Sequence, residues 1–459
     1  MNNRPRDMTF SSLDRQSTVA PPGFNRFLAP PAALAVHMSI GQVYAFSTFN
    51  LPLTKVIGIT HSAPADWDLK EIGWVFSIAI AILGLSAAVF GRWVEKVGPR
   101  KAMFIAALCF GGGFIVSAFG IHLHQLWLLY LGYGVLGGCG LGIGYIAPVS
   151  TLIKWFPDRP GMATGIAIMG FGGGALIGAP LSVLLMAHFK AAASNGVLET
   201  FVTMGVIYFM FMMIGVYAAR VPAPGWKPAG WTAPAQPKHL VTTADVAVDM
   251  AWRTPQFWLL WVVLCMNVTA GIGVLGQASP MIQEMFPHRV SPAAAASFVG
   301  LISLFNMAGR LCWATISDYI GRRNTYLVFF LLGILLYSTV PTIGHLGSIP
   351  LFVAAFGIIL SMYGGGFATI PAYLRDIFGT YQVGAVHGRL LTAWSVAGVL
   401  GPVLVNYIRQ YQIDHGVPKA QAYSVTMYIM CGLLLIGFLC NFAMRPVDEK
   451  YYYRGSTPS

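Results

Sequence analysis

Residues 91–101 read GRWVEKVGPRK and residues 317–323 read SDYIGRR, and each stretch follows a long apolar run. In both, an acidic residue (Glu95 or Asp318) stands three positions before a glycine (Gly98 or Gly321), and basic residues follow. The offset from Glu95 to Asp318 recurs in further pairs along the chain: Gly142 with Gly365, Pro148 with Pro371, and Gly165 with Gly388. We call it the repeat offset. The chain therefore contains two similar halves that run in the same direction.

The apolar runs of this sequence are long enough to cross a membrane. Hydrophobic residues make up 56% of the 459 residues and charged residues only 10%, whereas soluble domains carry about 25% charged residues. A spanning helix needs about 20 mostly apolar residues, and lipid cannot satisfy backbone amides, so each span must be helical. We expect an all-α membrane protein with twelve transmembrane helices in two parallel six-helix halves, over 28–53, 71–93, 101–120, 126–155, 161–189, 201–220, 255–281, 292–316, 325–344, 351–373, 388–408 and 422–444.

The polar segments between these runs predict the organisation and orientation of the chain. We expect a tail over 1–27, a six-helix bundle over 28–220, a Pro-rich linker over 221–254, a second bundle over 255–444 and a tail over 445–459. If both tails and the linker are cytoplasmic, the cytoplasmic segments hold 21 Lys and Arg residues and the outer segments hold 6. The excess of positive charge on the cytoplasmic side predicts a multi-pass protein with both termini cytoplasmic.

The two stretches quoted above resemble the repeated loop signature of the major facilitator superfamily, although Glu95 stands where that superfamily usually has Asp. The resemblance implies two six-helix halves with a binding site near the midplane between them. A carboxylate at a helix end and basic residues beyond a glycine turn can form charge-assisted hydrogen bonds. We therefore expect a conformational latch of Glu95, Arg100, Asp318 and Arg322. The alternative is that these charges serve only to orient the chain.

Other stretches resemble the oxalate/formate antiporter family and the related monocarboxylate transporters. They are GQVYAFS at 41–47, GIGYIAP at 142–148 with KWFP at 154–157, and GRLCW at 309–313 leading into Asp318, and the likeness extends from about residue 28 to 444. This resemblance implies a secondary transporter of a small organic anion in a bacterial inner membrane. In that family an arginine at the position of Arg310 contacts the substrate carboxylate.

Arg310 also stands out from the residues alone. It lies eight residues before Asp318, roughly 12 Å inside the helix end at 1.5 Å per residue, and a charge at that depth is a functional-site hypothesis by default. Its counterpart in the first half is Ala87, and no acidic residue lies well inside a span. A planar guanidinium suits a carboxylate, so we expect Arg310 to bind an anionic substrate. The alternative is a side chain that extends to the membrane surface or bonds carbonyl groups.

Trp394 affects the choice of substrate. Oxalate-type members of the resembling family have a lysine in the eleventh span, where this chain has Trp394, and no span contains a buried lysine. One buried positive charge balances one carboxylate. We therefore expect a monocarboxylate of the formate, lactate or pyruvate type, and keep a dicarboxylate of the oxalate type as the alternative.

Several polar or aromatic residues inside the spans are candidates for lining the site. Tyr44, Tyr145 and Tyr363 can each present a hydroxyl to an anion and an apolar ring to its carbon atoms. Gln42, two positions before Tyr44, and Trp394 are further candidates. His37 can bond the substrate or carry a coupled proton, or it can be a helix-packing residue.

Other classes of function find little support in the sequence. The six cysteines have no CxxC spacing, the Gly-rich 170–174 stretch lies inside an apolar run, and no catalytic set is evident, so we expect no metal, no cofactor and no enzymatic activity. The net charge of +12 is spread over short loops, which argues against nucleic acid binding. The expected partners are the small anion and the lipid bilayer, a coupled proton is left open, and we expect a functional monomer. A drug exporter and a non-transporting anion sensor remain alternatives.

Overall fold

The computed structural model describes residues 12–232, 240–242 and 244–453, and its regular secondary structure in these ranges is helical. The first half contains α1 (Ala29–Ile40), α2 (Ser47–Leu53), α3 (Leu69–Val97), α4 (Pro99–His122), α5 (Leu126–Leu129), α6 (Gly138–Trp155), α7 (Pro160–Phe189) and α8 (Val197–Ala218). The second contains α10 (Pro255–Met285), α11 (Pro292–Ile320), α12 (Arg322–Leu346), α13 (Ile349–Phe378), α14 (Val383–Leu390), α15 (Thr392–Asp414) and α16 (Ser424–Phe442). The short helix α9 (Val248–Ala251) lies between them.

Eleven spans are continuous enough to cross a membrane by length and composition within the described residues. A π-helical turn, η4 (Tyr130–Gly137), joins α5 to α6 in one of them. The first expected span differs, because the turn η3 (Gly41–Ala45) separates α1 from α2. A Cβ atom on Gly41 would lie 2.4 Å from the Phe171 carbonyl oxygen, so glycine allows α7 to pack directly on this break. With the broken first span the described part of the bundle has twelve crossings, which confirms the expected fold class.

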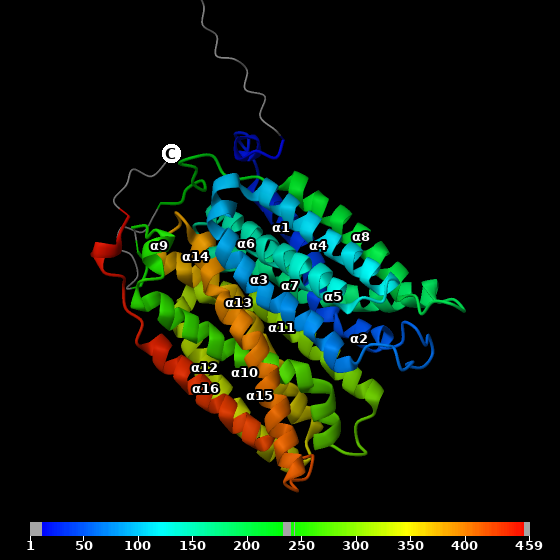
Figure 1. The fold of residues 1–459 in the computed structure, drawn as a ribbon. Helices are drawn as coiled ribbons and strands as arrows, with labels where there is room; N and C mark the ends of the chain where they lie inside the picture. Colours follow the sequence, from blue (N-terminus) through cyan, green and yellow to red (C-terminus); the bar gives the residue numbers. More distant parts are fainter. Residues whose placement is uncertain (1–11, 233–239, 243, 454–459) are drawn as a thin grey trace, which may run out of the picture.

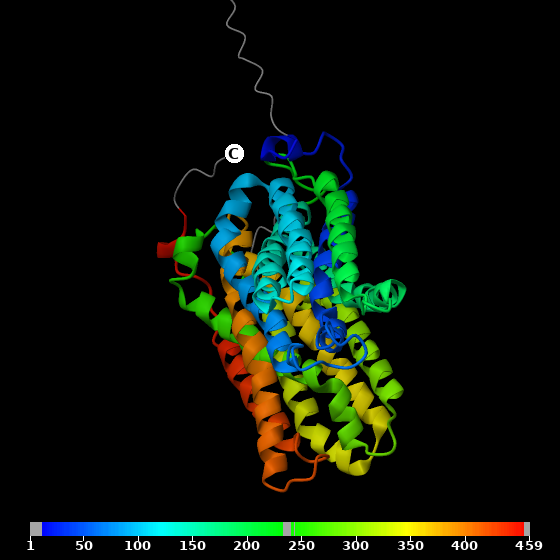
Figure 2. The ribbon, with the colours of Figure 1, turned by 45° about the vertical axis from the view of Figure 1, so that its right-hand side comes forward.

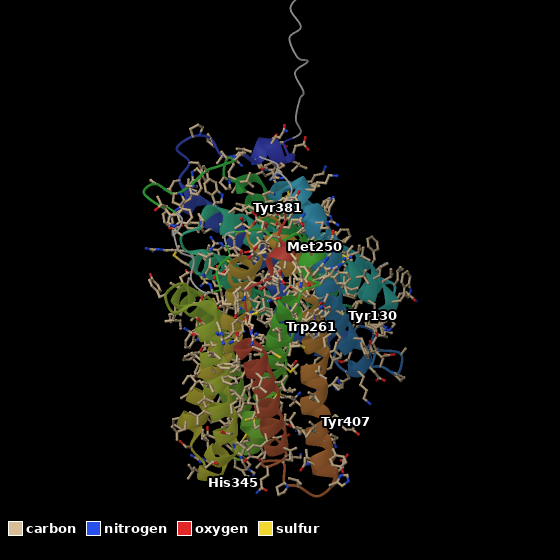
Figure 3. All side chains as sticks on the ribbon, turned by 90° about the vertical axis from the view of Figure 1, so that its left-hand side faces the viewer. Tyr130, Met250, Trp261, His345, Tyr381 and Tyr407 are labelled. Carbon is tan, nitrogen blue, oxygen red and sulfur yellow. The ribbon has the colours of Figure 1, made fainter. Side chains whose placement is uncertain are left out.

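The two halves lie side by side as one bundle of roughly aligned helices (Figures 1 and 2). They meet where α3 packs on α14 and α15, and where α7 packs on α11 and α13. Figure 3 places Met250 of α9 and Tyr381 toward one end of the bundle, and His345 and Tyr407 toward the other. We call the first the linker end; the charge distribution predicts that it is cytoplasmic.

Small residues allow the halves to approach closely. A Cβ atom on Gly84 of α3 would lie 2.5 Å from the Leu391 carbonyl oxygen, and one on Gly388 of α14 would lie 2.2 Å from the Ala87 carbonyl oxygen. Neither position has room for a side chain. In a membrane, where water does not drive helices together, such close backbone packing is a main source of attraction between helices.

Candidate functional site

Arg310 lies on α11 with a fully buried side chain. Its Nε donates to Asn306 Oδ1 one turn earlier, at 3.2 Å, and one terminal nitrogen, Nη1, donates to the Ile168 carbonyl oxygen of α7, at 3.4 Å. The guanidinium carbon lies 5.8 Å from the ring centre of Phe171 and 5.4 Å from that of Phe367. The side chain is therefore held in the interface between the halves, and does not extend to a surface.

The other terminal nitrogen of Arg310, Nη2, is buried and has no hydrogen-bond partner among the described residues. The hydroxyls of Tyr44, Tyr145 and Tyr363 likewise make no hydrogen bond of ordinary length to a residue that the structure describes. Tyr44 and Tyr145 lie close enough to Arg310, and Tyr44 to Tyr363, for weaker polar contacts. The indole nitrogen of Trp394 is also buried without a partner in the described chain. Because an unpaired buried polar group is costly, this concentration of donors favours a ligand that accepts hydrogen bonds.

Aromatic rings form the walls around these donors. The Trp394 ring centre lies 4.4 Å from that of Phe367, 5.4 Å from that of Phe171 and 5.5 Å from that of Tyr145. The Tyr44 ring packs edge-on against Phe171 at 5.1 Å. Both halves thus contribute to one cluster, which we call the Arg310 cluster: Arg310, Tyr44, Tyr145, Tyr363, Trp394, Phe171 and Phe367.

The Arg310 cluster carries one uncompensated positive charge. Among the described residues no acidic side chain forms an ion pair with Arg310. Burying an unpaired charge is expensive, and a carboxylate would offset it while accepting from the neighbouring hydroxyls. The arrangement suits one anionic group attached to a small apolar body.

Two further candidates occupy different surroundings. The ring nitrogen Nε2 of His37 lies 3.2 Å from the Tyr145 carbonyl oxygen, and its ring packs edge-on against the Tyr145 ring at 5.3 Å. His37 thus borders the Arg310 cluster from behind Tyr145. Gln42 turns away into the first half, where its oxygen accepts from the Tyr208 hydroxyl at 2.9 Å and its nitrogen donates to Ser182 at 3.4 Å. The structure does not bring Gln42 to Arg310.

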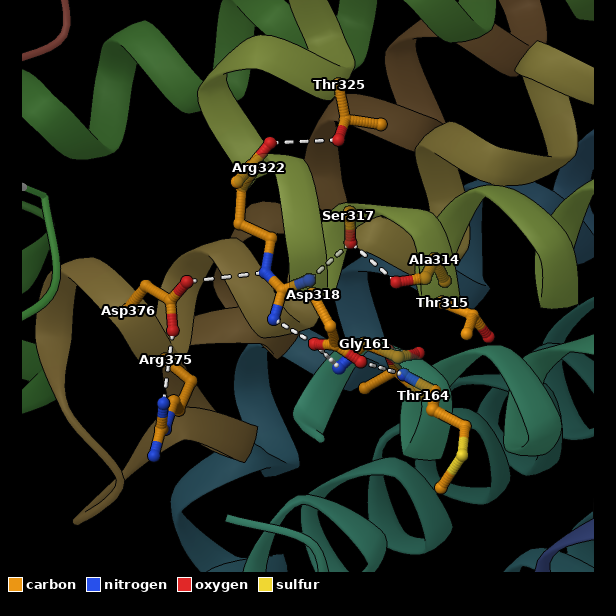
Figure 4. Close-up of polar contacts among 12 residues, drawn as sticks. Gly161, Thr164, Ala314, Thr315, Ser317, Asp318, Arg322, Thr325, Arg375 and Asp376 are labelled. Carbon is orange, nitrogen blue, oxygen red and sulfur yellow. Dashed lines mark hydrogen bonds and ion pairs between the residues drawn. The ribbon is translucent and has the colours of Figure 1, made fainter. Parts of the chain in front are cut away.

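Asp318 joins the halves at the linker end. Its two carboxylate oxygens accept from the backbone amides of Gly161 and Met162, each at 2.9 Å, at the first turn of α7 (Figure 4). Arg322 donates to Asp318 and, at 3.3 Å, to Asp376 of α13. A carboxylate at a helix N-terminus is favoured by the unpaired amides and the helix dipole. Asp318 therefore links α11 to α7 across the interface.

Glu95 of the first half makes the equivalent contact with a helix of the second half. It accepts from the amide of Gly384 at the start of α14, at 3.1 Å, and from Ser150 at 2.8 Å and Lys154 at 2.7 Å. Gly161 and Gly384 are themselves separated by the repeat offset, so the repeat that relates the two acids also relates the two helix ends. Glu95 and Asp318, which we predicted as latch residues, thus each contact the N-terminal turn of a helix in the opposite half.

Arg100 lies apart from this latch. Its guanidinium donates to the carbonyl oxygens of Ser12 at 2.6 Å, Val216 at 3.2 Å and Ala219 at 3.2 Å. Val216 and Ala219 belong to the first half and Ser12 to the tail that precedes it. The structure therefore places Arg100 where it fastens the end of α8, and Lys154 is the cation that binds Glu95.

The linker adds a contact that the sequence did not indicate. Asp249 of α9 accepts from Arg92 of α3 and from Arg389 of α14, each at 2.8 Å. One carboxylate thereby bridges the two halves at the linker end. We call this contact the Asp249 bridge.

A cavity of about 690 Å³ opens near the latch and not at the Arg310 cluster. Its lining includes Asp318, Arg322, Arg375 and Asp376, which form ion pairs with one another. The unpaired donors and the unbalanced charge lie instead at the Arg310 cluster.

Comparisons with known proteins agree with the fold. A sequence model of the Major Facilitator Superfamily matches residues 24–402. The oxalate:formate antiporter of Oxalobacter formigenes is 28% identical over 377 residues, covering 81% of both chains. The MFS-type transporter YhjX of Escherichia coli strain K12, which is described as uncharacterized, is 26% identical over 377 residues, covering 82% of this chain and 86% of its own. Apicoplast pyruvate carrier 1 of Toxoplasma gondii is 25% identical over 440 residues, covering 85% and 78%.

Among solved structures, the E. coli fucose:proton symporter FucP superimposes with a TM-score of 0.66 at 12% identity, covering 91% of this chain and 99% of its own. At that identity the likeness concerns the fold alone. The family match covers most of the chain, and the relatives named above support it. The chain belongs to the Major Facilitator Superfamily, and it is a multi-pass membrane transporter.

Proposed function

We propose that this transporter carries a small monocarboxylate, of the formate, lactate or pyruvate type, and that Arg310 binds the carboxylate. The observation that supports the proposal most strongly is the fully buried Arg310 side chain, whose terminal nitrogen Nη2 has no partner in the described chain. Tyr44, Tyr145 and Tyr363 add hydroxyl donors, and the surrounding rings accommodate a short carbon chain.

In this proposal, substrate binding lowers the free energy of the closed states. With no substrate, closing the halves over Arg310 buries an unpaired charge, which is costly in a low-dielectric interior. A bound carboxylate neutralises the guanidinium and satisfies the hydroxyls. The halves then alternate between opening at the outer end and opening at the linker end. Opening at the linker end breaks the contacts of Asp318 with α7 and of Glu95 with α14.

The named relatives support a carboxylate substrate, since one is an oxalate:formate antiporter and another a pyruvate carrier. A dicarboxylate is the second candidate, and the antiporter relative favours it. Against it, Trp394 occupies the wall where a second cation would be needed, and among the described residues Arg310 is the charged member of the cluster. One guanidinium balances one carboxylate.

Counterflow in proteoliposomes tests the proposal. Vesicles loaded with unlabelled formate, lactate, pyruvate or oxalate are diluted into the labelled compound, and accumulation of label is followed. We expect accumulation for a monocarboxylate and its loss in Arg310→Gln. Counterflow restricted to oxalate would favour the dicarboxylate candidate.

A further inference from the structure

His387 is a buried titratable residue without a role in the proposed site. It lies on α14 with 1% of its surface exposed, and neither ring nitrogen has a hydrogen-bond partner among the described residues. The Tyr145 ring centre lies 5.8 Å from that of His387 and 5.3 Å from that of His37. Buried polar groups are normally paired, so an imidazole with both nitrogens unpaired requires an explanation.

In the first half, the residue at the equivalent position does form a hydrogen bond. Thr164 is the counterpart of His387 at the repeat offset. Its hydroxyl donates to the Ala368 carbonyl oxygen at 2.7 Å, which links α7 to α13 across the interface. The second half has a histidine at the equivalent place, and there it gains no bond within the described chain.

His387 lies one helical turn from the latch. Gly384 precedes it by three residues, and the Gly384 amide is capped by Glu95 of α3. His387 therefore lies between the latch and the Arg310 cluster, in the part of the interface that must separate when the linker end opens. In the closed structure it is shielded from water, and opening would expose it to the linker-side solution.

The charges near His387 do not compensate a protonated imidazole. Its ring contacts that of Tyr145 on α6, and His37 on α1 lies within electrostatic range. Glu95 already accepts from three donors, and Arg389 on the same helix is paired with Asp249. The other charged or titratable groups on the linker-side parts of α3, α6, α10 and α13 are Arg92, Lys96, Lys154, Cys265, Tyr363, Tyr373, Arg375 and Asp376.

We propose that His387 is a proton-binding site that opens only toward the linker end, and that its protonation holds the transporter open on that side. A proton from the linker-side solution binds the imidazole when the halves are apart, and it must leave before they close. Protonated His387 would otherwise be buried without a counter-charge. The expected slowing of transport rests on the proposed function, because it is measured as exchange of the proposed substrate.

The expected size of the effect follows from proton linkage. The side-chain pKa of an exposed histidine is about 6.5. At a linker-side pH of 5.5 about ten of every eleven linker-open molecules would be protonated, so closure from that state would become roughly tenfold less favourable than at pH 7.5. Exchange should slow by up to that factor.

Exchange of labelled pyruvate, or of whichever monocarboxylate shows counterflow, tests this. Proteoliposomes with the linker end facing the lumen are compared at lumenal pH 5.5 and 7.5, with the outer pH held at 7.5. Wild type should slow by up to about tenfold at pH 5.5, whereas His387→Gln should not change. His345→Gln, at the exposed opposite end of α12, is the matched control and should behave as wild type.

A second measurement does not require transport. Val386→Cys places a smaller, buried thiol beside His387, and labelling by a membrane-impermeant maleimide from the linker side reports opening. The labelling rate of Val386→Cys is divided by the labelling rate of the same cysteine in the His387→Gln background. This ratio cancels the pH dependence of the thiol itself, and it should be higher at pH 5.5 than at pH 7.5. Equal ratios at both pH values, or unchanged pH sensitivity of exchange in His387→Gln, would overturn the proposal. Loss of all exchange with an increased labelling ratio would instead count against the proposed substrate.

Discussion

The Asp318 carboxylate on α11 accepts a hydrogen bond of 2.9 Å from the backbone amide of Gly161, at the first turn of α7 in the other half. Glu95 makes the corresponding contact with Gly384 at 3.1 Å. The repeat offset relates both the two acids and the two amides. The repeat therefore relates the two contacts, and we propose that together they act as a latch at the linker end.

Asp318→Asn should weaken this closure. The substitution keeps the size of the side chain but removes the charge that caps α7 and pairs with Arg322. A carboxylate at a partly buried helix N-terminus contributes up to about 2 kcal/mol, so the open population should rise by up to about 30-fold. Labelling of Val386→Cys from the linker side measures it. Asp448→Asn, in the exposed tail segment, is the control, and equal labelling in both variants would contradict the assigned role of Asp318.

The Asp249 bridge should be insensitive to pH in the physiological range. The hydrogen bond from Arg389 lowers the pKa of the Asp249 carboxyl, against the opposing effect of desolvation and with help from the charge of Arg92. A lowered folded-state pKa gives a contribution that is present above the ordinary value of about 3.9 and is lost as the pH falls through the lowered value. Between pH 5 and 8 the bridge should therefore be constant.

Asp249→Asn removes the Asp249 bridge at neutral pH. Because 48% of the Asp249 side chain is exposed, we expect the substitution to destabilise the closed state by no more than about 1 kcal/mol. The open population would then rise by roughly fivefold at most. The same cysteine labelling measures the change. A pH dependence of labelling between 5.5 and 7.5 that disappears in Asp249→Asn, and persists in His387→Gln, would show that the bridge and not His387 senses the proton.

Gly172→Ala should impair transport by displacing Arg310. A Cβ atom at this position would lie 2.8 Å from Arg310 Nε, so the guanidinium must shift from its place between Phe171 and Phe367. We expect the Michaelis constant for the monocarboxylate to rise severalfold. Gly112→Ala on α4 meets nothing within 4 Å and should transport as wild type. Equal Michaelis constants in the two variants would argue against a positioned guanidinium.

Trp394→Lys should shift selectivity toward a dicarboxylate. The substitution places a second cation in the wall of the Arg310 cluster, beside Phe367 and Tyr145. Competition by oxalate against labelled pyruvate should become stronger, while Trp394→Phe should leave oxalate a poor competitor. Unchanged competition in Trp394→Lys, in a variant that still exchanges substrate, would count against Trp394 as a determinant of charge selectivity.

Much of the fold could be predicted because it depends on local sequence. Span length, the 21-to-6 distribution of Lys and Arg residues and the repeated stretches all lie within short windows. Arg310, Tyr44, Tyr145, Tyr363 and Trp394 could be predicted as a group because polar residues are conspicuous in apolar spans. Because the family resemblance predicts a binding site between the two halves, these residues could also be expected to lie close together.

The features that sequence did not indicate depend on distant partners. At the break near Gly41 the backbone packs closely on Phe171, and Gln42 turns toward Tyr208, which is far away along the chain. Asn306 could have been found, because it precedes Arg310 by one helical turn. Asp249 and His387 could not, since a linker acid and a histidine near a helix start have no distinctive pattern until the halves are assembled.

The most direct test of the central claim is counterflow of labelled pyruvate, formate or lactate in Arg310→Gln. If Arg310 binds the carboxylate as proposed, its removal should cost about 2 kcal/mol or more, a loss of about 30-fold or greater. Arg310→Lys should retain part of the activity, because it keeps the charge but not the planar fork. Arg253→Gln, at an exposed linker position, controls for reconstitution and should match wild type. Wild-type counterflow by Arg310→Gln would contradict the account.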